Sequence, residues 1–139
     1  MYLFDTNVVS ALRRREREPA RFNEWASNVT FDVVFVSVVT VMEIEQGIIR
    51  LERRDARQGA TLRHWFKGPV LEGFRDRILP VDLGVARRAA ALHVPDPRPI
   101  ADALIAATAL VHDLIVVTRN ARDFAPTGAP VLDPWASEA

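Results

Sequence analysis

The chain has 139 residues, the length of one ordinary domain, and 49% of them are hydrophobic, which supports a buried core and excludes a disordered chain. It contains no cysteine, which excludes disulfides, thiolate zinc sites and cysteine nucleophiles. The formal net charge is zero, so no strongly basic overall field attracts nucleic acid. We find no repeat or long linker and expect one domain over residues 1–139.

The first third of the chain predicts two strands and three helices. An apolar run at Tyr2–Phe4 predicts a strand, and helical spacing follows through Val8–Leu12. A second helix is expected to start near Pro19, and the continuous apolar run Val33–Val36 predicts a strand that is covered on both faces. Apolar residues at helical spacing then predict a long helix over Val39–Arg54.

The middle of the chain is predicted to be largely helical. Helical material is expected from about Arg57 to Asp76, with a break near Gly68–Pro69, before a short strand at Ile78–Leu79. Another helix is expected over Leu83–His93. A proline-rich loop then leads into Ile100–His112, which is apolar nearly all round and is therefore predicted to be a buried helix.

The last third predicts a strand at Leu114–Val117, a turn at Thr118–Asn120, a short helical stretch that holds Asp123, and a final strand at Val131–Leu132. Strands that alternate with helices indicate a parallel sheet, because parallel neighbours require crossover connections. The predicted class is therefore α/β, with three layers and a central parallel sheet of about four to five strands.

Four acidic residues follow the expected ends of strands or open helices: Asp5, Glu43, Asp102 and Asp123. In open parallel sheets, ligands bind beyond the carboxyl ends of the strands. Four carboxylates gathered there would repel one another unless a divalent cation stabilised their ionised forms. The three histidines are scattered, so oxygen ligands and Mg²⁺ or Mn²⁺ are expected rather than zinc.

Helix capping is the competing interpretation of these acids. Thr40 to Glu43 has the spacing of a capping box, Asn120 to Asp123 imitates one, and Asp5 and Asp102 fit helix N-termini. Capping alone, however, would more naturally use serine, threonine or asparagine.

Four segments together resemble the PIN-domain ribonucleases, specifically toxins of the VapC and FitB type, and their order and spacing agree along essentially the whole chain. The four segments are Phe4–Val9, Ser37–Ile44, Asp102–Ala109 and Val117–Phe124.

The resemblance implies an endoribonuclease toxin that depends on Mg²⁺ or Mn²⁺, forms a homodimer and is inhibited by a cognate antitoxin. It matches the four acids to metal ligands and catalytic groups, and Thr6, Asn7, Thr118 and Asn120 to positions that orient ligands or waters. Many relatives carry an acid where this chain has Asn120, so the number of metal ions stays open. Arg119 could bind phosphate or simply be exposed.

Two alternatives remain at this point: a non-catalytic binding module of the same fold, and a phosphatase with Asp5 as nucleophile. The phosphatase would use an acid where Asn7 stands, and a supporting lysine, whereas the only lysine is Lys67. The arginine-rich segment Arg13–Arg17 is expected to contact substrate or antitoxin, or to be a solvated face. The amino terminus has neither a basic flank nor a long apolar run, which predicts no membrane segment and a cytoplasmic protein.

Overall fold

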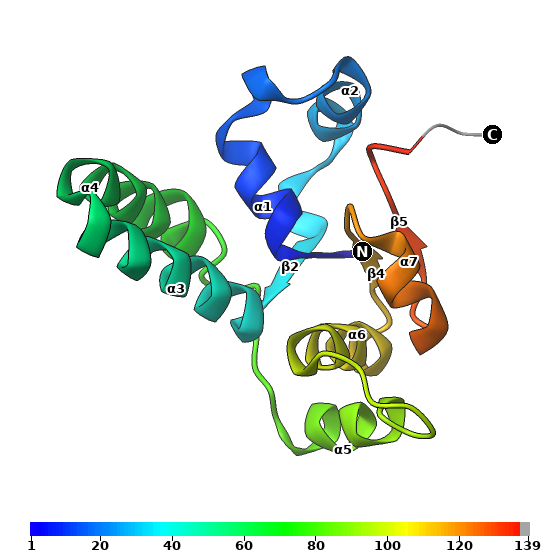
Figure 1. The fold of residues 1–139 in the computed structure, drawn as a ribbon. Helices are drawn as coiled ribbons and strands as arrows, with labels where there is room; N and C mark the ends of the chain where they lie inside the picture. The colour runs from blue at the N-terminus through cyan, green and yellow to red at the C-terminus, as the bar shows by residue number, and fades with distance from the viewer. Residues whose placement is uncertain (137–139) are drawn as a thin grey trace.

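The computed structural model describes residues 1–136 and has a central sheet of parallel strands between layers of helices (Figure 1). The strands are β1 (Tyr2–Phe4), β2 (Val34–Ser37), β3 (Ile78–Leu79), β4 (Ile115–Val117) and β5 (Val131–Leu132). They pair in the order β3-β2-β1-β4-β5, and every pairing is parallel. The predicted three-layer α/β class and the five predicted strands are confirmed.

Helices connect these strands as the apolar periodicity predicted. The α-helices are α1 (Thr6–Arg13), α2 (Ala20–Asn28), α3 (Val38–Arg54), α4 (Ala56–Trp65), α5 (Leu83–Leu92), α6 (Ile100–His112) and α7 (Ala121–Phe124). Single 3₁₀ turns lie at Arg15–Arg17, Phe31–Val33 and Ala125–Thr127, and a π-helical segment spans Phe66–Glu72. No helix within residues 1–136 is both long and apolar enough to cross a bilayer.

The register of the sheet assigns side chains to the two faces. Leu3 of β1 pairs with Val116 of β4, and both belong to the core formed with α6 and α7. The next pair, Phe4 and Val117, points to the opposite face and belongs to the core formed with α1, α2 and α3. Successive side chains in a strand alternate between faces, so both faces of the two central strands are buried.

The predicted break near Gly68–Pro69 is wrong, because the chain remains helical through this segment. Pro69 has no backbone N–H, and its ring would crowd the carbonyl four residues earlier in a regular α-helix. The helix widens instead to a π-turn, in which the N–H of Gly73 donates to the carbonyl of Gly68 at 3.0 Å. Gly73 is required there, since a Cβ would lie 2.1 Å from the Pro69 carbonyl oxygen.

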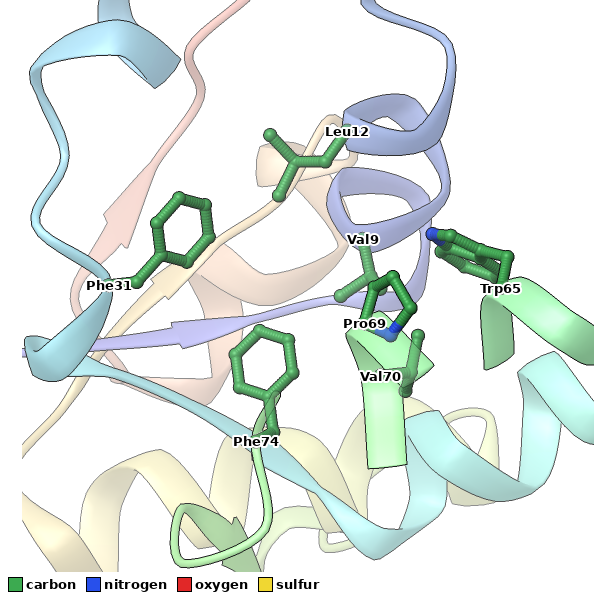
Figure 2. A pocket seen from close by; sticks show the side chains of 7 residues that line it. All are labelled: Val9, Leu12, Phe31, Trp65, Pro69, Val70 and Phe74. Carbon is green, nitrogen blue, oxygen red and sulfur yellow. The ribbon is translucent and has the colours of Figure 1, made fainter. Parts of the chain in front are cut away.

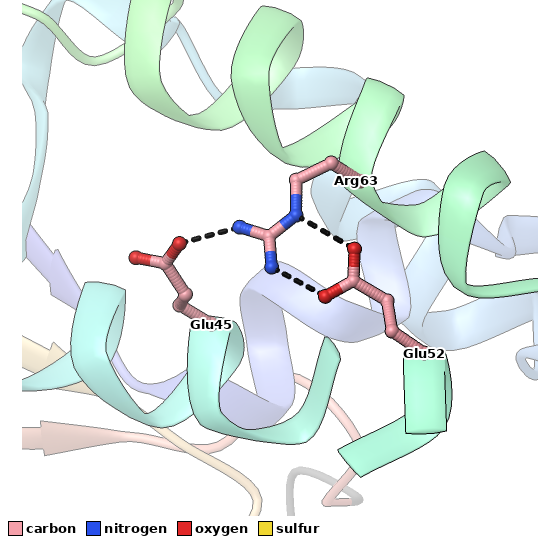
Figure 3. Close-up of polar contacts among 3 residues, drawn as sticks. All are labelled: Glu45, Glu52 and Arg63. Atoms are coloured by element: carbon pink, nitrogen blue, oxygen red, sulfur yellow. Dashed lines mark hydrogen bonds and ion pairs between the residues drawn. The ribbon is translucent and has the colours of Figure 1, made fainter. Parts of the chain in front are cut away.

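Helices α3 and α4 form an antiparallel hairpin that one arginine cross-links (Figure 3). Arg63 of α4 donates two hydrogen bonds to the carboxylate of Glu52, at 3.2 and 2.7 Å, and a third to Glu45. A planar guanidinium that holds two carboxylates fixes geometry better than a single ion pair. Glu45 therefore belongs to the hairpin, where it pairs with Arg63.

Candidate active site

Asp5 and Thr118 lie side by side because they follow neighbouring strands. Phe4 and Val117 are paired, and the hydrogen bonding extends one residue further, from the N–H of Asp5 to the carbonyl of Val117 at 2.9 Å. The Thr118 hydroxyl donates to Oδ2 of Asp5 at 2.8 Å. Both residues are buried, so without this hydrogen bond the Asp5 carboxylate would be poorly solvated.

The Asp5 carboxylate is fixed through both of its oxygens. Its Oδ1 accepts a hydrogen bond from the N–H of Thr6 at 2.8 Å, so Asp5 does cap α1 as the competing interpretation proposed. Its Oδ2 accepts from Thr118 and, at 3.3 Å, from the side-chain amide of Asn7. Capping and site formation are thus compatible, because each uses a different oxygen.

Glu43 is not part of a capping box. Helix α3 begins at Val38, and the hydroxyl of Ser37 accepts a hydrogen bond from the N–H of Val39 at 3.0 Å, so Ser37 is the N-cap. Glu43 lies further into the helix, half-buried, and its Oε1 accepts a hydrogen bond from the Thr6 hydroxyl at 2.6 Å. One residue of α1 therefore links the carboxylate on α3 to the loop that holds Asp5.

Asp102 and Asp123 come from the other side of the sheet. Asp102 lies half-buried in the first turn of α6, and Asp123 lies exposed in the short helix α7. Burial, followed by repulsion from Asp5, Asp123 and Glu43, raises the pKa of Asp102 above its ordinary value of 3.8. Asp102 therefore lies near enough to the other three predicted acids for their charges to raise its pKa, and the four acids come from four separate segments.

The pKa of Asp5 is also raised in this group. Burial raises the pKa of Asp5, repulsion from Glu43 adds to the rise, and the hydrogen bonds from Thr118, Thr6 and Asn7 oppose it. Within residues 1–136 no lysine or arginine side chain lies within 4.0 Å of any of the four acids, because the ion pairs found there involve other carboxylates. No direct ion pair in the described part of the chain therefore neutralises this group.

The donor chemistry suits a hard divalent cation. The group offers carboxylate oxygens, with hydroxyl and amide oxygens nearby, and these are the ligands that Mg²⁺ and Mn²⁺ prefer. Across the described residues, no three acidic or histidine side chains stand close enough together to enclose an ion by themselves. Mg²⁺ commonly keeps several waters and uses only one or two carboxylates directly, so an open group of this kind fits it.

The remaining predicted residues surround Asp5. Asn7 accepts a hydrogen bond from the backbone N–H of Arg119 at 3.1 Å, and the backbone N–H of Asn120 donates to the Thr118 hydroxyl at 3.0 Å. The guanidinium of Arg119 lies 5.2 Å from the centre of the Trp135 ring. Asn7 and Thr118 therefore order the loop after β4 against the loop after β1, while the side chains of Arg119 and Asn120 are exposed.

Two hollows near α1 differ sharply in character. One, of about 290 Å³, is lined by Thr6, Ser10, Arg13, Glu43 and Gly47 among others, so it borders one of the four acids. Outside its own helix backbone, a Cβ on Gly47 would meet no atom of residues 1–136 within 4 Å, so this side of α3 faces open space.

The second hollow, of about 210 Å³, has apolar walls from α1, the Phe31 turn and the π-helical segment, and none of the four acids lines it (Figure 2). In Figure 2 the side chains of Leu12, Phe31 and Phe74 point into it. An apolar hollow of this kind offers nothing to a phosphate group.

Sequence reasoning missed two residues that contribute to the site. Thr40, which it treated as a cap, places its hydroxyl 3.5 Å from the Thr6 hydroxyl. Ser10 lies one turn after Thr6 and lines the hollow beside Glu43. Helical spacing from Thr6 is the signal that would have found Ser10, whereas the Thr40 contact joins elements 34 residues apart and left no local pattern.

Known proteins are similar to this chain along nearly its whole length. The VapC ribonuclease Y4jK of Sinorhizobium fredii is 30% identical over an alignment of 140 positions, which covers 97% of this chain and 98% of that protein. The crystal structure of FitAcB from Neisseria gonorrhoeae is 31% identical with a TM-score of 0.89, over 99% of this chain and 100% of that one.

A toxin-antitoxin complex from Klebsiella pneumoniae is 26% identical with a TM-score of 0.66, over 99% of this chain and 100% of that one. The sequence also matches the PIN domain family across residues 2–129. Because this match spans nearly the whole described fold, the chain belongs to the PIN domain family.

Proposed function

We propose that this chain is an endoribonuclease that hydrolyses phosphodiester bonds of RNA with Mg²⁺ or Mn²⁺. The observation that carries the proposal is the group of four carboxylates at the carboxyl edge of the sheet: Asp5, Asp123 and Glu43 all raise the pKa of Asp102, and no cationic nitrogen in residues 1–136 lies within 4.0 Å of these acids. Similarity to a VapC ribonuclease along nearly the whole chain supports RNA as the substrate.

The proposed metal ligands are Asp5, Glu43, Asp102 and Asp123. A bound divalent ion would polarise the scissile phosphate and lower the pKa of a coordinated water. The oxygen donors of these acids suit Mg²⁺ or Mn²⁺, and the hollow beside Glu43 leaves room for substrate phosphate oxygens.

The side chains of the chain itself would supply position and proton transfer. Asp5 stays in place because three hydrogen-bond donors hold its oxygens. Thr6 holds Oε1 of Glu43 and leaves Oε2 available. A carboxylate oxygen that is not engaged by metal accepts the proton of the attacking water, a role open to Glu43, Asp102 and Asp123.

We further propose a cognate antitoxin as the protein partner, assembly as a homodimer, and action in the cytoplasm as one domain over residues 1–139. The toxin-antitoxin complex from Klebsiella pneumoniae and the FitAcB structure support the partner, since both align with essentially the whole chain.

The phosphatase alternative is not favoured. Asn7, which stands where a second acid would act, uses its side chain to join Asp5 to the N–H of Arg119. Lys67 lies in the π-helical segment, among residues that do not line the hollow beside Glu43.

The test is cleavage of a structured RNA with added Mg²⁺, with chelator, and with the variant Asp5→Asn. We expect cleavage with Mg²⁺ only, and a loss of at least about a hundredfold in Asp5→Asn, as for removal of a group that stabilises transition-state charge. Asp113→Asn is the matched control. It makes the same chemical change at an exposed residue with φ of 59°, a conformation that asparagine also tolerates.

Melting curves of both variants separate loss of chemistry from loss of fold. If the parent binds RNA and Asp5→Asn leaves every measured activity unchanged, catalysis by these carboxylates is excluded. The chain would then be a non-catalytic binding module.

A further inference from the structure

The exposed side of α1 carries polar residues from the carboxylate group toward a cluster of arginines. Thr6, Ser10 and Arg13 recur at intervals of four and three, which places them on one side of the helix. Arg14 and Arg17 follow at the carboxyl end of α1 and in the next turn. The chain therefore leads directly from acidic to basic surface within a few turns.

Three neighbouring hollows border α1 and share lining residues. The hollow beside Glu43 shares Ser10 with a second one of about 280 Å³, lined by Asn7, Arg14, Arg17 and Arg119 among others. A third, of about 360 Å³, shares Arg14 and Arg17 with the second and adds Arg54. We call the part lined by Arg14, Arg17 and Arg119 the arginine groove.

The sequence cluster Arg13–Arg17 divides into two groups in the fold. Arg15 is used internally: its guanidinium donates to Oδ1 and the carbonyl of Asn23, at 3.1 and 2.8 Å, and to Ser27 at 2.6 Å. The other three arginines turn toward the groove.

The groove has an excess of positive charge. No carboxylate in residues 1–136 lies within 4.0 Å of the guanidinium of Arg14, Arg17 or Arg119. Glu18, the acid that lines the groove, accepts a hydrogen bond from the indole N–H of Trp135 at 2.8 Å. Burial and repulsion from Arg14 and Arg17 lower the pKa of Arg13, which agrees with mutual repulsion of these cations. A bound anion would relieve that repulsion.

We propose that the arginine groove binds backbone phosphates of the RNA strand on one side of the cleaved bond, with Arg14, Arg17 and Arg119 as the phosphate contacts. This inference rests on the proposed ribonuclease function. Helix α1 has eight residues, so it separates the acids from Arg14 by about 12 Å. That distance corresponds to about two to four nucleotides, from an extended to a fully stacked strand.

Continuity with the carboxylate group favours RNA over an acidic protein segment as the occupant. The groove and the hollow beside Glu43 share Ser10, so a strand whose phosphate reaches the acids continues along the arginines without leaving the surface. A polymer with one phosphate per nucleotide matches arginines that are spread along a path, and guanidinium groups match phosphate geometry.

The experiment measures binding of fluorescein-labelled oligouridines by anisotropy, in chelator, with a gel to confirm that the RNA stays intact. For Arg14→Gln/Arg17→Gln we expect about tenfold weaker binding of long oligomers at low salt. The slope of log K against log salt should fall by about 1.4, or about 0.7 for each phosphate that the variant no longer neutralises. Arg87→Gln/Arg88→Gln, which removes the same charge from exposed positions on α5, should leave both quantities unchanged.

Oligomer length locates the contact. The parent should gain affinity once the strand exceeds about four nucleotides, and the double variant should not. Arg14→Lys/Arg17→Lys should restore the salt slope, because lysine keeps the charge, and this result would separate phosphate binding from a role in folding.

Three results would overturn the inference. An unchanged salt slope in Arg14→Gln/Arg17→Gln would do so, as would an equal loss of affinity for dinucleotides and long strands. The third is binding of labelled oligoglutamate that depends on Arg14 and Arg17 while RNA binding does not. If the parent cleaves RNA in any of these cases, the proposed function survives and the arginine groove alone is wrong. If the parent neither binds nor cleaves RNA, both fail.

Discussion

Replacing Thr118 by valine removes one hydroxyl from the centre of the site and preserves the shape of the side chain. That hydroxyl donates to Oδ2 of Asp5 at 2.8 Å and accepts from the N–H of Asn120 at 3.0 Å. Thr118 is fully buried and Asp5 is 6% exposed, so water cannot readily replace the missing donor.

A hydrogen bond to a charged group contributes about 1.5–3 kcal/mol. We therefore expect Thr118→Val to lower the free energy of unfolding by about 2–3 kcal/mol at neutral pH. For a chain of this length that corresponds to a melting temperature lower by about 6–9 °C.

The pH dependence of this loss identifies its cause. Burial raises the pKa of Asp5 above its ordinary 3.8, so the parent loses stability as pH rises from 3.8 through the raised pKa. The Thr118 bond opposes the rise. Without it the pKa of Asp5 increases further, and the variant loses more stability over a wider pH range. The difference between variant and parent is thus smallest near pH 3.8, grows with pH, and becomes constant above the pKa in the variant.

Urea unfolding of metal-free protein across this pH range measures the difference. Thr127→Val is the matched control, because Thr127 is also buried and its partners among residues 1–136 are neutral, the carbonyl of Phe124 and the N–H of Ala129. Its destabilisation should not depend on pH through this range. If Thr118→Val also lost the same free energy at all pH values, a bond to the ionised Asp5 would not be its cause.

Three further changes test other parts of the structure. Asp102→Asn should reduce cleavage by at least about a hundredfold, since proton-transfer and charge-stabilising groups contribute that much. It should also keep or raise the metal-free urea midpoint, because burial and repulsion raise the pKa of Asp102, and a fall would support capping. Gly59→Ala should destabilise the hairpin by about 1–3 kcal/mol, because a Cβ would lie 2.7 Å from the Cα of Glu52. Gly47→Ala should stabilise the protein by about 1 kcal/mol, because Gly47 lies inside α3 and a new Cβ would meet no atom of residues 1–136 within 4 Å outside its own helix backbone. Equal effects of the two glycine variants in urea titrations would contradict the close packing described for Gly59.

The strands and the positions of the acids were predictable because their signals are local. The apolar runs before Asp5 and Thr118 predicted two strands, and both strands formed at the centre of the sheet. Parallel pairing then requires that residues after neighbouring strands meet at one edge.

The features that sequence reasoning missed depend on tertiary contacts or on fine local geometry. Ser37 and Thr40 are both good caps, and only the end of β2 decides that α3 starts at Val38. Pro69 is compatible with a break or with a π-turn, and the choice depends on how the segment packs through Phe66 and Val70. Arg15 differs from its neighbours because Asn23 and Ser27 lie within its reach.

The strand order has a consequence for the timing of activity during translation. Asp5 is synthesised 113 residues before the threonine that holds its second oxygen, and β4 and β5 join the sheet only at that later stage. A nascent chain that ends before Asp102 and Asp123 lacks half of the carboxylates. On the proposed assignment of these acids, RNA hydrolysis therefore requires synthesis of the chain at least as far as Asp123.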